Sequence, residues 1–234
     1  GGTQRSRCSV RRVVMSVSVS ATDQAKAARV ASRQLQSLST SERDRLLKNI
    51  ASSLEKNASE IMRSNAEDIE AATNSSDVDQ NLVARLKLSS QKIANLSNGL
   101  RALSEMEEPI GKVLERTEIA NGLDLSKVTS PLGVLLIIFE SRPDALVQIC
   151  GLCIRTGNGL LLKGGKEASK SNRCLHEIIV KEFDRFNVDR ACVSLITGRE
   201  EIKELLGLHD VIDLCIPRGG NALVTYIQNN TKIP

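Results

Sequence analysis

Apolar residues recur every three or four positions through the first part of the chain, from Ala21 to about Ser104. This spacing places them on one face of a helix and leaves the charged residues on the other face. Ser39-Thr40-Ser41-Glu42 fits a helix-capping box. The apolar positions that follow it are Leu46, Leu47, Ile50, Leu54 and Ile61, and a later set is Ile93, Leu96, Leu100 and Leu103. The sequence therefore predicts an N-terminal helical part over residues 21–108.

The pattern changes at Pro109, where the helical spacing ends. Residues 109–130 contain two runs of β-like composition, and Asn121-Gly122 separates them. Asn-Gly supplies the positive φ angles of a tight hairpin turn between two antiparallel strands. We therefore predict a β-hairpin over residues 109–130.

After Pro131 short apolar runs alternate with helical spacings. The predicted strands are Gly133–Phe139, Gly159–Lys163, Cys192–Ile196 and Val211–Ile216. The predicted helices are Asp144–Arg155, Ser169–Phe186, Glu200–Leu206 and Asn221–Asn229. Continuous apolar strands are typical of a parallel sheet that helices cover on both faces. The sequence thus predicts an α/β fold in which residues 131–234 form a doubly wound, Rossmann-like parallel sheet, with ligands at the carboxyl ends of the strands.

One predicted strand ends in a candidate phosphate-binding turn, Lys163-Gly164-Gly165-Lys166. It is not a P-loop, because Leu160 stands where that motif needs glycine and Glu167 where it needs Ser or Thr. A lysine that leaves a strand beside two glycines suits ribose hydroxyls or a phosphate. Taken alone, the turn is more typical of an ordinary strand-to-helix connection with solvated lysines, because Gly-Gly turns are common.

The other predicted strands also end in charged or glycine-rich turns. The segment Glu140-Ser141-Arg142-Pro143 puts a guanidinium group beside a helix start. Thr197-Gly198-Arg199 follows the third strand, and Pro217-Arg218-Gly219-Gly220 follows the fourth. Because the carboxyl ends of parallel strands lie at one edge of a sheet, these turns predict a crevice for an extended, anionic ligand.

Three long motifs contain these strand ends: SPLGVLLIIFESRPDALVQ at residues 130–148, GNGLLLKGGKEASKSN at 157–172 and DVIDLCIPRGGNALV at 210–224. They closely resemble the γ-glutamyl phosphate reductases, or glutamate-5-semialdehyde dehydrogenases, a branch of the aldehyde dehydrogenase superfamily that acts in proline biosynthesis. The resemblance runs from about residue 21 to residue 234 and includes SNAEDI at 64–69 and LVARLKLSSQKI at 82–93.

The resemblance implies a reaction and a cofactor site. The reaction is NADPH-dependent reduction of L-glutamyl 5-phosphate to L-glutamate 5-semialdehyde, with release of phosphate. The resemblance implies that Lys163 binds the adenosine ribose of NADPH. The remaining cofactor-binding positions that it implies are Glu140 and Ser141 along the cofactor, Gly164 and Gly165 beside Lys163, and Pro217, Arg218, Gly219 and Gly220 at the diphosphate.

The resemblance also implies how the substrate is held and what this chain lacks. Other aldehyde dehydrogenases place an oxyanion-stabilising Asn in the loop after the first strand. This sequence has Arg142 at that position, and the resemblance implies that its guanidinium group stabilises the negative charge of the phosphate-bearing substrate. The family's nucleophile is a cysteine that forms a thioester. It is expected in a catalytic domain beyond Pro234, because none of the six cysteines here matches its motif. The resemblance thus implies a fragment with an incomplete cofactor domain and no turnover.

Cys150-Gly151-Leu152-Cys153 has the spacing of a metal or redox CxxC motif. It lies within a predicted helix, with no second cysteine pair and no nearby His. Buried core thiols are therefore predicted rather than a metal site.

Two other interpretations of function stay open. One is a non-catalytic cofactor-binding or assembly module. The other is the reductase half of a bifunctional pyrroline-5-carboxylate synthase, against which the Arg-rich start of the chain counts, because that protein would carry a kinase domain and an acidic linker upstream. For the full-length protein the resemblance implies a homo-oligomer, with the hairpin at the subunit interface, and an association with glutamate 5-kinase.

Charge and composition exclude two classes of partner. Residues 1–20 contain four arginines and no acid, and removing these four from the 32 basic residues leaves 28, equal to the number of Asp and Glu residues. Only 2% of residues are aromatic and Trp is absent, so base-stacking surfaces are scarce. We therefore predict no nucleic-acid binding. The longest apolar run, Val134 to Phe139, is too short to cross a membrane.

Residues 1–20 form a predicted leader, rich in Arg, Ser and Val. This composition suits an organelle transit segment and equally a disordered or untranslated leader before Met15. The cysteines occur without a secretory context, which favours an intracellular protein. The predicted location is the cytoplasm if translation starts at Met15, and a plastid or mitochondrion if the leader is a transit segment.

Overall fold

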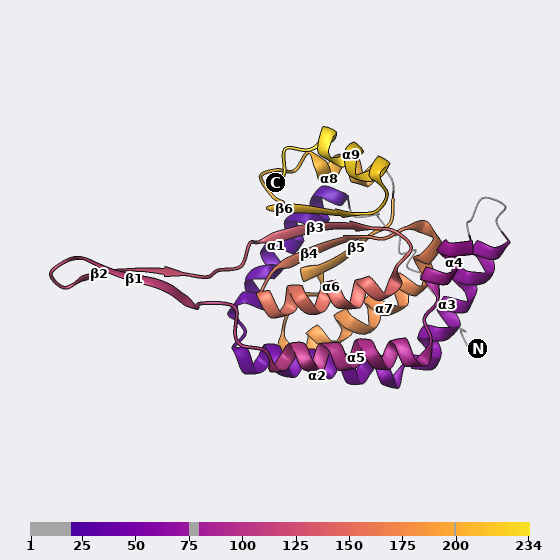
Figure 1. The fold of residues 1–234 in the computed structure, drawn as a ribbon, viewed down its shortest axis with the longest axis horizontal. Coiled ribbons are helices and arrows are strands. Elements are labelled where there is room, and N and C mark those ends of the chain that lie inside the picture. Colours follow the sequence, from indigo (N-terminus) through magenta and orange to yellow (C-terminus); the bar gives the residue numbers. More distant parts are fainter. Residues whose placement is uncertain (1–19, 75–79, 199) are drawn as a thin grey trace, which may run out of the picture.

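A parallel sheet between two helical layers forms the body of the chain, in a computed structural model that describes residues 20–74, 80–198 and 200–234 (Figure 1). The predicted leader therefore lies outside the described residues, except for Ser20. The sheet has the order β5-β4-β3-β6, and its neighbouring strands all run parallel. Its strands are β3 (Val134–Phe139), β4 (Gly159–Lys163), β5 (Val193–Ile196) and β6 (Leu214–Arg218).

Side chains of the central strands alternate between two hydrophobic clusters, as the two faces of a strand require. Leu135, Ile137 and Phe139 pack into one cluster, whereas Leu136 and Ile138 pack into the other. All six residues of β3 and all five of β4 are buried. The predicted doubly wound sheet with both faces covered is therefore confirmed.

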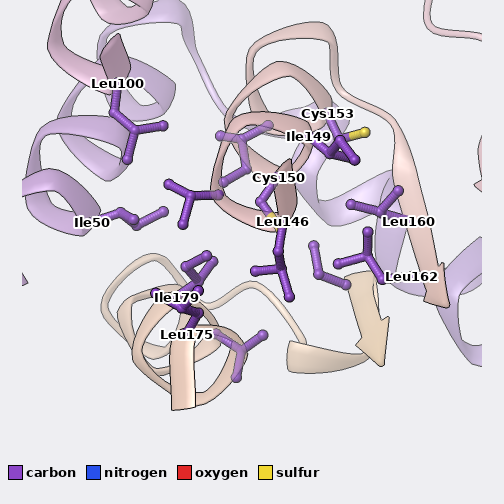
Figure 2. Close-up of a cluster of buried hydrophobic side chains, with 14 of the residues drawn as sticks. Ile50, Leu100, Leu146, Ile149, Cys150, Cys153, Leu160, Leu162, Leu175 and Ile179 are labelled. Carbon is purple, nitrogen blue, oxygen red and sulfur yellow. The ribbon is translucent and has the colours of Figure 1, made fainter. Parts of the chain in front are cut away.

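The larger cluster lies beneath two layers of helices. It joins β3 and β4 to α6 (Pro143–Thr156) and α7 (Ser169–Phe183), and these helices pack in turn against α2 (Thr40–Lys56) and α5 (Ser90–Glu105). Figure 2 shows Ile50 of α2 and Leu100 of α5 facing Leu146 of α6 and Ile179 of α7. The apolar stripes predicted for the N-terminal helices thus cover the outer side of the sheet's own helices.

The opposite face of the sheet is covered by α1 (Ala21–Ser37), α8 (Glu200–Leu206) and α9 (Asn221–Asn230). The remaining helices are α3 (Ala58–Thr73) and α4 (Gln80–Leu86), of which α3 packs on α7. The predicted capping box is present at the start of α2, where Ser39 and Glu42 each accept a backbone N–H of the other.

The hairpin β1 (Val113–Ala120) and β2 (Leu123–Val128) projects away from the body, and all its residues are exposed (Figure 1). The predicted hairpin is therefore present, but the expected turn geometry is wrong at one residue. Gly122 has φ +77°, whereas Asn121 is not among the residues with positive φ. The ladder is irregular between Glu118 and Ala120, so a local bulge, rather than a second positive φ, accommodates the reversal.

The last predicted strand is shifted by the structure from Val211–Ile216 to Leu214–Arg218. Val211 and Ile212 are buried, but they lie in a turn in which both N–H groups donate to the carbonyl of Leu208. Asp213 then accepts the N–H of Val134 through its side chain, at 2.7 Å. The buried apolar residues therefore begin at Val211, before the strand starts at Leu214. For this reason the predicted strand began three residues too early.

Other boundaries differ by a few residues. The predicted helix Ser169–Phe186 is α-helical only to Phe183, after which Asp184–Phe186 forms a 3₁₀ turn that ends at Asn187 with φ +52°. Cys192 ends a 3₁₀ turn rather than beginning β5. Beside the outer edge of β6, Cys215 N–H donates to the carbonyl of Pro234 at 2.8 Å.

We expect His176 on α7 to contribute to the pH dependence of the chain's stability. Its ring Nε2 lies 2.8 Å from the carbonyl of Val193, and burial lowers the pKa of His176 because the charged ring is poorly solvated there. The unfolded chain therefore takes up a proton near pH 6.5 more readily than the folded chain. We expect the melting temperature to fall as pH drops from 7 to 5, and His176→Gln to flatten this slope. An unchanged slope in the variant would exclude His176 as its source.

Candidate functional site

The carboxyl ends of three strands meet around the middle of the sheet. Phe139 at the end of β3 is paired with Arg218 of β6, and Ile138 with Lys163 of β4. The chain proceeds from β3 to β4 and β5 on one side and then crosses to β6 on the other side of β3. Such a reversal leaves a crevice between the two strands, where open α/β sheets bind ligands.

The loop after β3 is held from both sides by carboxylates. Ser141 has φ +51°, a left-handed conformation that costs a non-glycine residue free energy. Glu167 supports it by accepting the N–H of Ser141 at 2.8 Å and its hydroxyl at 2.7 Å. On the other side, Glu140 accepts the N–H of Gly220 at 3.1 Å. This loop carries Arg142 to the surface, where its side chain is exposed.

Lys163 is not a solvated lysine, because only 5% of it is exposed. Its Nζ donates to the carbonyl of Gly164 at 2.8 Å. The side chain lines two adjoining cavities, of about 580 Å³ and 260 Å³. The interpretation of an ordinary turn with solvated lysines is therefore wrong for Lys163.

The two glycines of the turn have a packing role that the sequence did not show. A Cβ on Gly164 would lie 2.3 Å from Nδ2 of Asn172, and one on Gly165 would lie 2.0 Å from Glu167. They therefore let the turn pack against Asn172 of α7 and the carboxylate that supports Ser141. Asn172 is buried, and its Oδ1 has no hydrogen-bond partner.

Sequence reasoning missed a third cation at the end of β6. A pocket of about 540 Å³ is lined there by Glu140, Ser141, Arg142, Pro217, Arg218, Gly219, Gly220 and also Arg85 of α4. All of the predicted cofactor-binding residues line at least one of three adjoining cavities. Arg85 lies within a motif quoted above, but only the packing of α4 places it beside the strand ends.

The start of α7 is less available to an anion than its position suggests. Asp68 of α3 accepts the N–H groups of Lys170 and Ser171, at 3.1 and 2.7 Å. These amides would otherwise attract a phosphate. The start of α9 lies at the same edge of the sheet. It follows Gly220 and has no side-chain cap. Arg199, in the turn after β5, lies outside the described residues.

A separate groove of about 560 Å³ lies between α5 and α6. Its lining is largely apolar and includes Leu96, Leu100, Leu103 and Leu152. Lys92 is the one cation among its described lining residues, and Asp144 adds a carboxylate with one buried oxygen that has no hydrogen-bond partner. This groove is poorly suited to a diphosphate compared with the arginine-lined pocket.

Cys150 and Cys153 of the CxxC pair are core thiols, as predicted. Cys150, Cys153 and Cys192 are buried, and none of the cysteines in the described part of the chain forms a disulfide. Burial raises the pKa of Cys153 and of Cys192 to about 12. Within the same residues, no cluster of His, Cys, Asp and Glu could hold a metal ion.

These thiols should resist alkylation in the native chain. A thiol with a pKa near 12 is almost entirely protonated at pH 8, and the thiolate is the reactive form. We expect iodoacetamide to label Cys150, Cys153 and Cys192 only after denaturation, as followed by peptide mass spectrometry. Rapid native labelling of Cys153 would contradict its placement in the core.

Residues 9–232 match the aldehyde dehydrogenase family. The chain belongs to this family. Its membership confirms the resemblance drawn from the motifs, and it implies a nicotinamide cofactor. Within the described residues, no helix combines the length and the apolar character that a membrane crossing requires.

Individual relatives show a more specific similarity. A delta-1-pyrroline-5-carboxylate synthase of Mesembryanthemum crystallinum is 53% identical over 212 residues, which are 91% of this chain and 29% of that protein. A gamma-glutamyl phosphate reductase of Natronomonas pharaonis is 43% identical, with 89% of this chain and 48% of that protein covered. The chain therefore spans about half of this reductase and under a third of the synthase.

Solved structures agree with these relatives. The gamma-glutamyl phosphate reductase of Thermotoga maritima matches with a TM-score of 0.88 and 30% identity, over 92% of this chain and 52% of that one. The reductase of Saccharomyces cerevisiae matches with a TM-score of 0.86 and 37% identity, over 92% and 55%. The predicted α/β fold of this branch of the family is therefore confirmed.

Proposed function

We propose that this chain is the NADPH-binding part of an enzyme that reduces L-glutamyl 5-phosphate to L-glutamate 5-semialdehyde and releases phosphate. The observation that carries the proposal is that the ends of β3, β4 and β6 place Arg142, Lys163 and Arg218 on adjoining cavities. The similarity to gamma-glutamyl phosphate reductases supports the choice of substrate.

The residues at the crevice fit a phosphorylated dinucleotide. Asn172, whose Oδ1 is buried without a hydrogen-bond partner, and Lys163, which carries an ammonium group, line the same cavity. An acceptor and a cation side by side suit a ribose that carries a hydroxyl and, in NADPH, a 2′-phosphate. Lys166 and Arg173 line the same cavity and add two further cations, which supports NADPH over NADH.

Each element at the strand ends has a distinct task in this proposal. Lys163 fixes the adenosine end, and Gly219 and Gly220 admit the diphosphate to the start of α9. Glu167 holds Ser141 and thereby fixes the loop that presents Arg142. Arg142 stabilises negative charge on the phosphate that departs when the acyl group is captured by the nucleophile. NADPH, when bound, would supply the hydride that afterwards reduces the acyl group.

The described cysteines do not serve as the nucleophile of this reaction. A thiolate must capture the acyl group beside the nicotinamide, whereas these thiols are buried or half-buried and none lines the cavities at the crevice. Burial also raises the pKa of Cys215, the least buried of them, to about 11. We infer that residues 1–234 alone have no turnover, and that a segment outside them supplies the cysteine.

A second candidate is the reductase half of a pyrroline-5-carboxylate synthase. It is favoured by identity, which reaches 53% with such synthases and 43% with a separate reductase. The residues at the crevice would then do the same chemistry. Sequencing the transcript upstream of codon 1 distinguishes the two, because only the synthase has a kinase domain in the same reading frame.

The test of the proposed function uses the full reading frame that contains this chain. The purified protein should form NADPH from NADP⁺ when L-glutamate 5-semialdehyde and phosphate are both present, and not when phosphate is omitted. The 234-residue chain should form none. Equal rates with and without phosphate would contradict the proposed reaction.

Arg142→Lys tests the proposed anion contact in that protein. Lysine keeps the charge but loses the planar fork of donors that binds two phosphate oxygens at once. We expect turnover to fall about tenfold or more, as one lost charge-assisted hydrogen bond predicts, with the Michaelis constant for NADP⁺ unchanged. Wild-type turnover in the variant would exclude a two-oxygen contact.

We further propose that the full-length protein is a homo-oligomer joined through the β1–β2 hairpin. Exposed apolar side chains support this proposal, since the hairpin carries Val113, Leu114, Ile119, Leu123, Leu125 and Val128 at the surface. Such a cluster on a projecting hairpin needs a cover in solution. Association with glutamate 5-kinase, and a plastid, mitochondrial or cytoplasmic location, stay predictions of the sequence.

A further inference from the structure

Three arginines from distant parts of the chain line the pocket at the ends of β3 and β6. Arg142 follows β3 and Arg218 ends β6, whereas Arg85 comes from α4 in the N-terminal helical part. Among the described residues, no ion pair or side-chain hydrogen bond involves any of the three guanidinium groups. By contrast, Arg101 and Arg155 each form an ion pair with a carboxylate.

The lining of this pocket is therefore positive. Its only carboxylate among the described lining residues is Glu140, which accepts the N–H of Gly220. Guanidinium groups keep their charge at every physiological pH. Three such groups around one pocket repel one another unless an anion lies between them.

The start of α9 lies beside the same pocket. Gly219 and Gly220 line the pocket, and α9 begins directly after them without a side-chain cap. A Cβ on Gly219 would lie 2.5 Å from the carboxylate of Glu140, so glycine is needed for this close packing. The N-terminal end of a ten-residue helix favours negative charge nearby.

We propose that this pocket binds a phosphate group and that Arg85 is one of its ligands. Planar guanidinium forks from separate directions match the several oxygens of a tetrahedral phosphate dianion. The assignment of Arg85 stands on the pocket, and it rests on the proposed function only for the source of the phosphate. That source is either the acyl phosphate of the substrate or the diphosphate of the cofactor. In both cases α4 becomes part of the site, so the N-terminal helical part contributes a ligand and not only a covering layer.

The test is calorimetric titration of the full-length protein at low ionic strength, first with inorganic phosphate and then separately with NADPH. Three forms are compared: wild type, Arg85→Gln, and Arg33→Gln as a control on the exposed face of α1, away from this pocket. Because Arg85 is exposed, its replacement should leave the melting temperature unchanged. We expect Arg85→Gln to weaken phosphate binding about ten- to hundredfold, as loss of a charged hydrogen bond predicts, and Arg33→Gln to bind as wild type does.

The NADPH titration identifies the source. If Arg85 serves the acyl phosphate, NADPH affinity stays the same in Arg85→Gln, whereas it falls in parallel with phosphate affinity if Arg85 serves the diphosphate. Absence of phosphate binding by the wild type, or equal binding by Arg85→Gln, would overturn the proposal. Neither titration depends on turnover, so a phosphate site that needs Arg85 would stand even if the full-length protein failed to oxidise the semialdehyde.

Discussion

Replacing Lys163 with Ala in the full-length protein is expected to raise the Michaelis constant for NADPH about ten- to hundredfold, the equivalent of one charged hydrogen bond of ~1.5–3 kcal/mol. The reason is the position of this ammonium group, which is buried and borders both cavities of the turn after β4. The Michaelis constant for L-glutamyl 5-phosphate should change far less, because Lys163 does not line the pocket of Arg142. Initial rates at varied NADPH give the result.

Two further variants separate a lost contact from a damaged fold. Lys163→Met keeps most of the buried volume without the charge, so it should weaken NADPH binding as Lys163→Ala does but melt nearer to the wild-type temperature. Lys48→Ala removes an exposed lysine of α2 and should change neither quantity. A normal constant for NADPH in Lys163→Met would remove Lys163 from the cofactor site.

Replacing Arg155 with Met is expected to cost about 3 kcal/mol of folding free energy, near the low end of the 3–5 kcal/mol typical of a broken buried ion pair. Only 3% of the Arg155 side chain is exposed. Its guanidinium binds Asp44 at 2.6 Å and the carbonyl of Met106, which ties the end of α6 to α2 and to the segment after α5. Asp44 is partly exposed, so water recovers part of the loss after substitution.

Urea unfolding of the 234-residue chain measures this effect. The matched control is Arg190→Met, which breaks an ion pair of similar type with Asp184 on the surface. Surface pairs contribute little, so the unfolding midpoint of the control should not change measurably. Equal midpoints for the two variants would show that the buried network does not stabilise the packing of α6.

The sheet could be predicted from the sequence because its central strands are buried on both faces, which favours apolar residues along each strand. The runs over β3 and β4 were located to within one residue, since every side chain there is buried. The last strand was misplaced because Val211 and Ile212 are buried in a turn, and burial alone does not distinguish a turn from a strand. The side chain of Asp213, which caps the start of β3, is a long-range contact without a local pattern.

Some residues of the candidate site could likewise be predicted from the sequence, and others could not. Lys163, Arg142 and Gly219 could be grouped from the sequence, because the ends of parallel strands converge at one edge. Glu167 and Arg85 could not. The support that Glu167 gives to Ser141, and the position of Arg85 beside the end of β6, depend on how α4 and the turn after β4 pack. No spacing along the chain encodes these contacts.

The central claim is that the ends of β3, β4 and β6 bind NADPH. Hydrogen–deuterium exchange of the chain with and without saturating NADPH tests it most directly, because protection reports each segment separately. The account predicts slower exchange in residues 139–145, 163–168 and 218–224, with the β1–β2 hairpin unchanged as an internal control. Protection confined to the groove between α5 and α6, or no protection at the three strand ends, would contradict it.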